Sequence, residues 1–205
     1  MKKSIATVVS YLFHPIWLVP LMAAYLIYVD PVLYLGVTPR IKLFRLLTVI
    51  GNNVFFPLLS VVLARALGFI GSFQMKDAKD RIIPYIATLT WYFWSWRVMQ
   101  NFQDSPAPMT AMLFGVFLSA SAGLVLNSFL KISMHTIGVG GLVAFMLLLA
   151  FQGEQGAALP LALSILIAGL VWTARLSVSD HTKAELGMGF IVGMICQAAG
   201  TLFFH

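Results

Sequence analysis

Four side chains with the chemistry to hold and attack a phosphate lie just outside apolar segments of the chain: His135, Arg175, His181 and Glu185. If residues from Thr182 onward are helical, His181 and Glu185 share one helix face at i and i+4. The carboxylate then fixes one imidazole nitrogen and leaves the other free as a nucleophile or base. The guanidinium of Arg175 is a planar fork of donors that matches phosphate oxygens. The alternative is a surface ion pair beside a histidine at the lipid head-group boundary.

His135 lies in the short polar segment 131–136, directly before the glycine-rich helix start IGVGG. A helix N-terminus attracts anions through its free N–H groups and its dipole. Ser133, Thr136 and these backbone donors could contact a phosphoryl oxygen, and His135 could protonate a leaving oxygen. In the alternative interpretation the glycines serve close helix packing, and His135 is merely interfacial.

The most polar segment is 71–81 (GSFQMKDAKDR), in which Lys76, Lys79 and Arg81 stand beside two acidic residues. Such a run of charges is commonly a solvated loop. Arg81 differs, because it stands at the mouth of the next apolar segment. In the segment that follows Arg175, the carboxylate of Asp180 could form an ion pair with the Arg175 guanidinium and so compete with a phosphate for it.

The composition predicts a membrane protein. Of the 205 residues, 60% are apolar and 10% are charged, against about 25% charged in an ordinary soluble domain, and the mean hydropathy is +0.92. Cys196, the single cysteine, lies in the last apolar run, which excludes a disulfide framework and a cysteine-rich metal site. The net charge of +6 fits either cytoplasmic loops or anion binding. The chain lacks a basic face with interleaved exposed aromatic residues, which argues against a nucleic-acid partner.

Apolar runs long enough to cross a bilayer fill nearly the whole chain, so we expect one integral-membrane domain over 1–205, an all-α transmembrane bundle of six or seven spans. The first run is too long for a signal peptide, and we expect it to be retained. His14-Pro15 and Pro20 predict a kink in it, and Pro84 is expected to open the third span. The expected spans are 5–29, 43–70, 84–99, 109–130, 137–151, 157–174 and 186–204.

Counting the crossings brings the reactive residues to one side. The segment 71–81, His135 and the segment 175–185 are each separated by an even number of spans, so they share one end of the bundle. The opposite end receives 30–42, 101–108, 153–156 and the C-terminus. Two other polar residues, His14 and Asn127, are expected to form hydrogen bonds between helices.

Three motifs in this order resemble the signature motifs of the type-2 phosphatidic acid phosphatase superfamily: Arg81-x-x-Pro84, Ser133-x-His135-Thr136, and Ala174-Arg175-x5-His181-x3-Glu185. The resemblance covers about residues 76 to 195, with two additional N-terminal spans in 1–71 and the catalytic bundle in about 72–204. Members are integral-membrane phosphatases that act on lipid phosphates and pyrophosphates. They use no metal or other cofactor and pass through a phosphohistidine.

The resemblance implies a role for each matching residue. His181 would be the nucleophile, Glu185 would orient it, and His135 would protonate the leaving group. The substrate phosphate would be bound by Arg175, Arg81, Lys79, Lys76, Ser133 and Lys131.

The motifs also differ from those of the family. Gln74 stands where the first motif has lysine, and Pro84 follows Arg81 by three residues instead of one. Ile132 and Met134 replace proline and glycine in the second motif, and Glu185 replaces the aspartate of the third. With Phe13-His14-Pro15 in its first span, the chain is similar to a divergent branch of small bacterial members, which implies a bacterial inner membrane.

Two other functions remain open. His135, His181 and Glu185 could form a two-histidine, one-carboxylate metal site of a metal-dependent hydrolase. Alternatively, the fold could serve a non-catalytic lipid-binding or transport protein, although a transporter places ionisable groups near the bilayer midplane.

The side of the membrane and the head group also remain open. Lys2, Lys3, Lys76 and Lys183 favour a cytoplasmic site, whereas Arg40, Lys42 and Arg45 favour the reverse. Phosphatidate, phosphatidylglycerophosphate, prenyl pyrophosphate and lipid A phosphate all fit the motifs.

Overall fold

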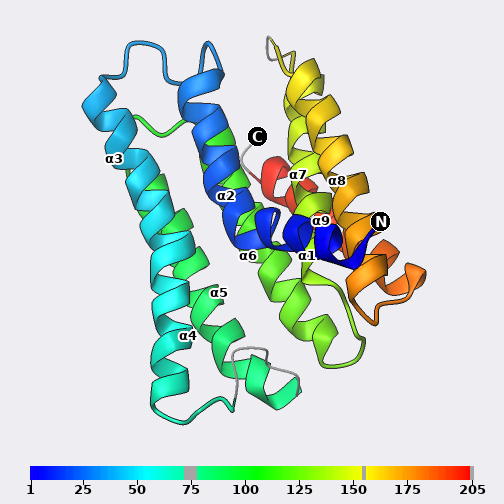
Figure 1. Cartoon of the computed structure of the whole chain (residues 1–205). Coiled ribbons are helices and arrows are strands. Elements are labelled where there is room, and N and C mark those ends of the chain that lie inside the picture. Colours follow the sequence, from blue (N-terminus) through cyan, green and yellow to red (C-terminus); the bar gives the residue numbers. More distant parts are fainter. Residues whose placement is uncertain (72–77, 154–155, 204–205) are drawn as a thin grey trace.

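The predicted all-α bundle is confirmed. The computed structural model describes residues 1–71, 78–153 and 156–203, with the backbone alone for 78–81, and these ranges contain helices and turns but no strand. Figure 1 shows the helices running up and down past one another. They are α1 (Lys3–Leu12), α2 (Pro15–Ala24), the π-helix η1 (Tyr25–Val29), α3 (Pro39–Ile50), the π-helix η2 (Gly51–Phe55), α4 (Phe56–Ala66), α5 (Ala78–Gln100), α6 (Ala107–Asn127), α7 (Met134–Phe151), α8 (Ala158–Val178) and α9 (Lys183–Leu202).

The described helices make the chain an integral membrane protein. Five helical segments are long and apolar enough to cross a bilayer: α6, α7, α8, α9 and the continuous run Pro39–Ala66. The pair Lys3–Leu12 and Pro15–Val29, bent by 51°, passes the same test together and makes a sixth if it forms one broken span. The expected third span, 84–99, corresponds to α5, which has 23 residues and packs against α4 and α6. It does not pass as a span by hydropathy among the described residues.

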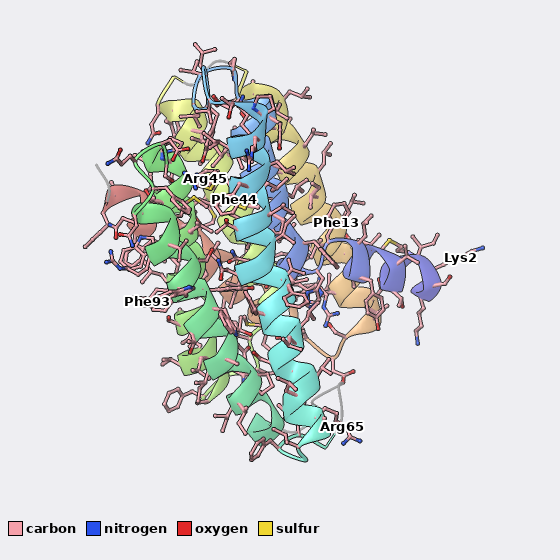
Figure 2. All side chains as sticks on the ribbon, turned by 90° about the vertical axis from the view of Figure 1, so that its left-hand side faces the viewer. Lys2, Phe13, Phe44, Arg45, Arg65 and Phe93 are labelled. Atoms are coloured by element: carbon pink, nitrogen blue, oxygen red, sulfur yellow. The ribbon has the colours of Figure 1, made fainter. Side chains whose placement is uncertain are left out.

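Two prolines behave differently from each other. The expected kink at His14-Pro15 is a bend of 51° between α1 and α2, with His14 as N-cap and Pro15 at the first helical position. In contrast, the prediction that Pro84 opens the third span is wrong, because α5 begins at Ala78 and Pro84 lies inside it. Figure 2 shows α1 projecting sideways from the bundle, with Lys2 at its tip and Phe13 at the bend.

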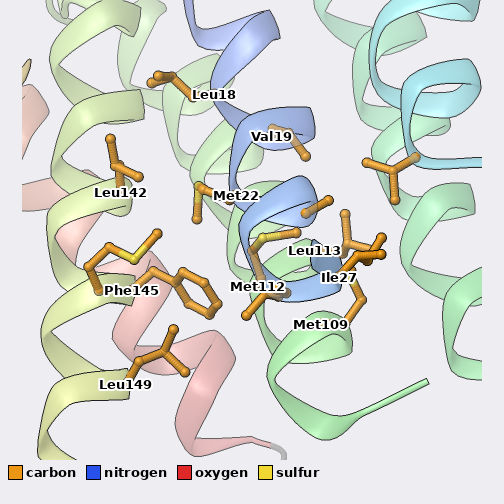
Figure 3. Packing of buried hydrophobic residues seen from close by; sticks show 14 of the residues in the cluster. Leu18, Val19, Met22, Ile27, Met109, Met112, Leu113, Leu142, Phe145 and Leu149 are labelled. Carbon is orange, nitrogen blue, oxygen red and sulfur yellow. The ribbon is translucent and has the colours of Figure 1, made fainter. Parts of the chain in front are cut away.

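The two ends of the bundle receive the loops that the crossing count assigned to them. The end of α4, the loop 128–133 and the loop 179–182 lie at the lower end in Figure 1. The loops 30–38 and 101–106 lie at the upper end. The apolar core, drawn in Figure 3, fills the space between α2, α6 and α7 with methionine, leucine and valine side chains.

A buried cation joins elements at the upper end. The Arg45 side chain forms a salt bridge with Asp104 and lies 3.3 Å from the centre of the Phe102 ring. The hydrogen bond from Arg45 holds the pKa of the Asp104 carboxyl below its usual range. Arg45 therefore has a structural role at the end away from the reactive residues.

Glycines allow α7 and α9 to touch. A Cβ at Gly140 would overlap the carbonyl oxygen of Phe190, and one at Gly193 would overlap that of Ile137. The glycines of IGVGG thus support the packing interpretation at these positions. This contact fixes the helix that carries His135 against the helix that carries Glu185.

Replacing Gly193 by alanine is expected to destabilise the protein by about 1–3 kcal/mol, because the new methyl group forces two backbones apart. The matched control is Gly169→Ala on α8, where a Cβ meets no atom within 4 Å. That change is expected to stabilise the helix by about 0.5–1 kcal/mol. Thermal unfolding in detergent measures both, and equal unfolding temperatures would contradict the assigned close approach.

Candidate functional site

The residues expected to act together line one cavity. It has a volume of about 770 Å³, and its wall includes His135, Arg175 and His181. Ser133 and Lys131 line the same cavity. These side chains come from the loop 128–133, the start of α7, the last turn of α8 and the loop 179–182. The predicted convergence is therefore confirmed for two of the three stretches, 131–136 and 175–185. The charged side chains of the third stretch, 71–81, lie outside the described residues.

His181 and Glu185 form the expected i, i+4 contact, although His181 precedes the helix. Nδ1 of His181 lies 3.4 Å from Oε2 of Glu185, a charge contact that does not meet hydrogen-bond geometry. The glutamate is held by a capping box: Oε2 accepts from the Thr182 N–H at 2.8 Å, and the Thr182 hydroxyl oxygen accepts from the Glu185 N–H at 3.2 Å. The carboxylate is thus fixed before any ligand arrives. The spacing Thr-x-x-Glu is the sequence signal for this box.

The surroundings of His181 favour the neutral form of its imidazole. Burial lowers the pKa of His181, and the nearby charge of Arg175 lowers it further, while the contact with Glu185 opposes both. The imidazole is therefore uncharged at neutral pH. With Nδ1 directed to the carboxylate, Nε2 is the nitrogen left to react.

His135 is oriented by the N-terminal helix. It is the second residue of α7, and its Nε2 lies 3.1 Å from the carbonyl oxygen of Ser10 in α1. Because a carbonyl oxygen only accepts, Nε2 carries the hydrogen in this contact. Nδ1 is then the nitrogen that can exchange a proton with a ligand. The contact between α1 and His135 could not be read from the sequence.

His14 was expected to form a hydrogen bond between helices. In the structure it is part of the cavity wall. Its Nδ1 accepts from the N–H of Ile16 at 3.3 Å, which caps α2. Its ring stands edge-on to that of His135, with the ring centres 5.0 Å apart. The His-Pro pair signals the cap, but the neighbour at position 135 depends on the bend between α1 and α2.

Arg175 has no acidic partner among the described residues. Its Nε is buried without a hydrogen bond. The expectation that Asp180 competes for it is wrong: the Asp180 carboxylate lies 4.0 Å from Nζ of Lys131, which also donates to the Asp180 carbonyl at 3.3 Å. Lys131 thus links the loops 128–133 and 179–182. A partly buried guanidinium without a counter-ion favours binding of an anion.

The second motif offers one more polar group. Ser133 precedes α7 as its N-cap, is 1% exposed, and its hydroxyl has no hydrogen-bond partner among the described residues. It lines the cavity beside His135. Met134, which replaces a glycine of the family motif, lies over Gly123 of α6 and packs between these helices.

The first motif is described only in part. Lys76 lies outside the described residues, and the side chains of Lys79 and Arg81 do as well. Pro84 of the same motif lines the cavity, so α5 reaches its wall.

The residues of the alternative metal site are not gathered. Within the described parts of the chain, no three His, Cys, Asp or Glu side chains are placed to hold one metal ion, and this includes His135, His181 and Glu185. Comparisons of the chain with known protein families, with curated proteins and with solved structures found no match.

Proposed function

We propose that this chain is a metal-independent lipid phosphatase of a bacterial inner membrane. It would hydrolyse a phosphomonoester or pyrophosphate of a lipid head group through a phosphohistidine on His181. One observation carries the proposal: the guanidinium of Arg175, which has no acidic partner among the described residues, shares a cavity with two imidazoles at one end of apolar helices.

The proposed reaction has two steps. Nε2 of His181 attacks phosphorus and the bond between phosphorus and the lipid oxygen breaks. His135, charged as an imidazolium only when the anionic phosphate is bound beside it, gives its Nδ1 proton to the leaving oxygen. Water then attacks the phosphohistidine and gives a proton to His135, and inorganic phosphate leaves. Glu185 stabilises the correct orientation of His181 in both steps.

The charge on the transferred group needs fixed donors. Arg175 lies beside both imidazoles, and the unpartnered hydroxyl of Ser133 lies in the same wall. Such preorganised donors stabilise the developing charge more in a partly buried site than in water. Lys131 and the cations Lys76, Lys79 and Arg81 would complete this anion-binding set.

A non-catalytic transport or lipid-binding protein is the second candidate. The histidines and charged side chains of the cavity lie at the start of α7, in the last turn of α8, in the loops 128–133 and 179–182, and between α1 and α2. Transporters place such groups near the bilayer midplane. The position at one boundary therefore favours the enzyme.

The test is phosphate release by purified protein from a panel of lipid phosphates with EDTA present. We expect release to continue, and a labelled substrate to leave acid-labile phosphate on the protein, because histidine carries the phosphoryl group. Release that stops with EDTA and returns with a divalent metal would support the metal-dependent alternative instead.

A further inference from the structure

We propose that the apolar part of the cavity holds the hydrocarbon chain of a single-chain lipid phosphate, such as an alkyl, monoacyl or prenyl phosphate. The assignment of the phosphate end rests on the proposed function. The assignment of the hydrocarbon chain to the apolar part rests on the walls, depth, volume and opening of the cavity.

The histidines and the charged side chains are confined to one end of the cavity. Away from them the wall is mostly aliphatic, with a few uncharged polar side chains such as Thr88, Ser119 and Gln197. The aliphatic wall comprises Leu18, Val19 and Met22 of α2, Pro57, Leu58 and Val61 of α4, Val116 and Ala120 of α6, and Ile137 and Leu142 of α7. A ligand that fits both ends has an anionic head and an apolar tail.

The depth of the cavity matches one extended chain. The wall extends from His181 in the loop 179–182 to Gln197, well inside α9. From Lys183 to Gln197 a helix rises about 20 Å at roughly 1.5 Å per residue. A lipid tail covers half of a hydrocarbon core of about 30 Å, so about 15 Å is needed.

The volume favours one chain over two. If a methylene group takes about the 30 Å³ that a water molecule takes, a chain of about 16 carbons fills roughly 500 Å³. The cavity of about 770 Å³ therefore accepts one such chain and a phosphate. Two chains would need roughly 1,000 Å³, which exceeds it.

Part of the cavity wall is exposed at the surface of α4. The helices α2 and α4 line the cavity from two sides, α2 packing against α3 and η2 while α4 packs against α5. Leu58 of α4 lines the cavity and is nevertheless 46% exposed. A tail can thus enter sideways from the bilayer.

Two neighbouring valines of α4 provide the variant and its control. Val61 lines the cavity, whereas Val62 is 51% exposed on the outer face. Val61→Phe is expected to lower kcat/KM for hexadecyl phosphate at least about tenfold, the lower end of what one badly placed group costs in an apolar pocket. It should leave kcat/KM for butyl phosphate unchanged, and Val62→Phe should change neither. An equal effect of both variants would overturn the tail site.

Labelling tests the site without catalysis. A hexadecylphosphonate with a diazirine at its far end cannot be hydrolysed, so a failed phosphatase proposal does not affect this readout. In phosphatidylcholine nanodiscs we expect crosslinks to α2, α4 and α6 residues of the wall, and fewer in Val61→Phe. Crosslinks confined to outward-facing residues such as Val62, or turnover of dipalmitoyl phosphatidate equal to that of hexadecyl phosphate, would overturn the proposal.

Discussion

Replacing His181 by alanine is expected to stop phosphate release, with a fall in kcat on the order of 10⁴-fold or more. The proposed nucleophile is the Nε2 atom of a neutral imidazole whose Nδ1 faces Glu185 at 3.4 Å. Without it, no phosphohistidine can form at this position. His135→Ala should cost less, on the order of 10²–10⁴-fold, because water can partly replace a general acid. Phosphate release from a lipid phosphate, measured at saturating substrate, gives both values.

The control for this prediction is His14→Asn in the same cavity wall. Asparagine is a good N-cap, so α2 should keep its start at Pro15 while the imidazole is lost. We expect a much smaller loss of kcat than for His181→Ala. Wild-type phosphate release by a folded His181→Ala protein, judged by its unfolding temperature, would rule out the phosphohistidine at this position.

Sequence patterns predicted the spans better than their beginnings. Long apolar runs require burial in lipid whatever their neighbours are, which is why the all-α bundle could be predicted. The start of α5 could not, since proline fits the first turn of a helix but is also accepted further in when the surrounding helices stabilise it. Pro84 is a case of the second kind, six residues after Ala78.

The site could be predicted where it depends on crossing number and local spacing. The local spacing places His181 next to Glu185. The number of crossings brings Arg175 and His135 to the same end of the bundle. The bend of 51° between α1 and α2 is a tertiary feature, and it brings Ser10 and His14 to His135. No periodicity encodes that approach. The partner of Asp180 likewise depended on where the loop 128–133 comes to lie, beside Lys131.

Replacing Arg175 by alanine is expected to lower kcat/KM on the order of 10²–10³-fold, the loss typical of removing one donor to developing negative charge. Arg175→Lys should recover only part of it, because an ammonium keeps the charge but loses the planar fork. The matched control is Arg97→Ala on α5, an exposed arginine bonded to Gln100. It should leave kcat/KM unchanged, and an equal loss in both variants would argue against a phosphate site at Arg175.

The pH profile separates this role from a structural one. Burial and the charge of Arg175 hold the pKa of His181 below its usual 6.5. The acid limb of kcat/KM, which reports loss of the neutral nucleophile, should therefore lie below pH 6.5 in the wild type. Removing the guanidinium removes a repulsion that disfavours the imidazolium, so the pKa rises and the limb moves to higher pH in Arg175→Ala. A structural defect would lower the whole profile without moving the limb, and an unmoved limb would contradict the assigned effect of the Arg175 charge on His181.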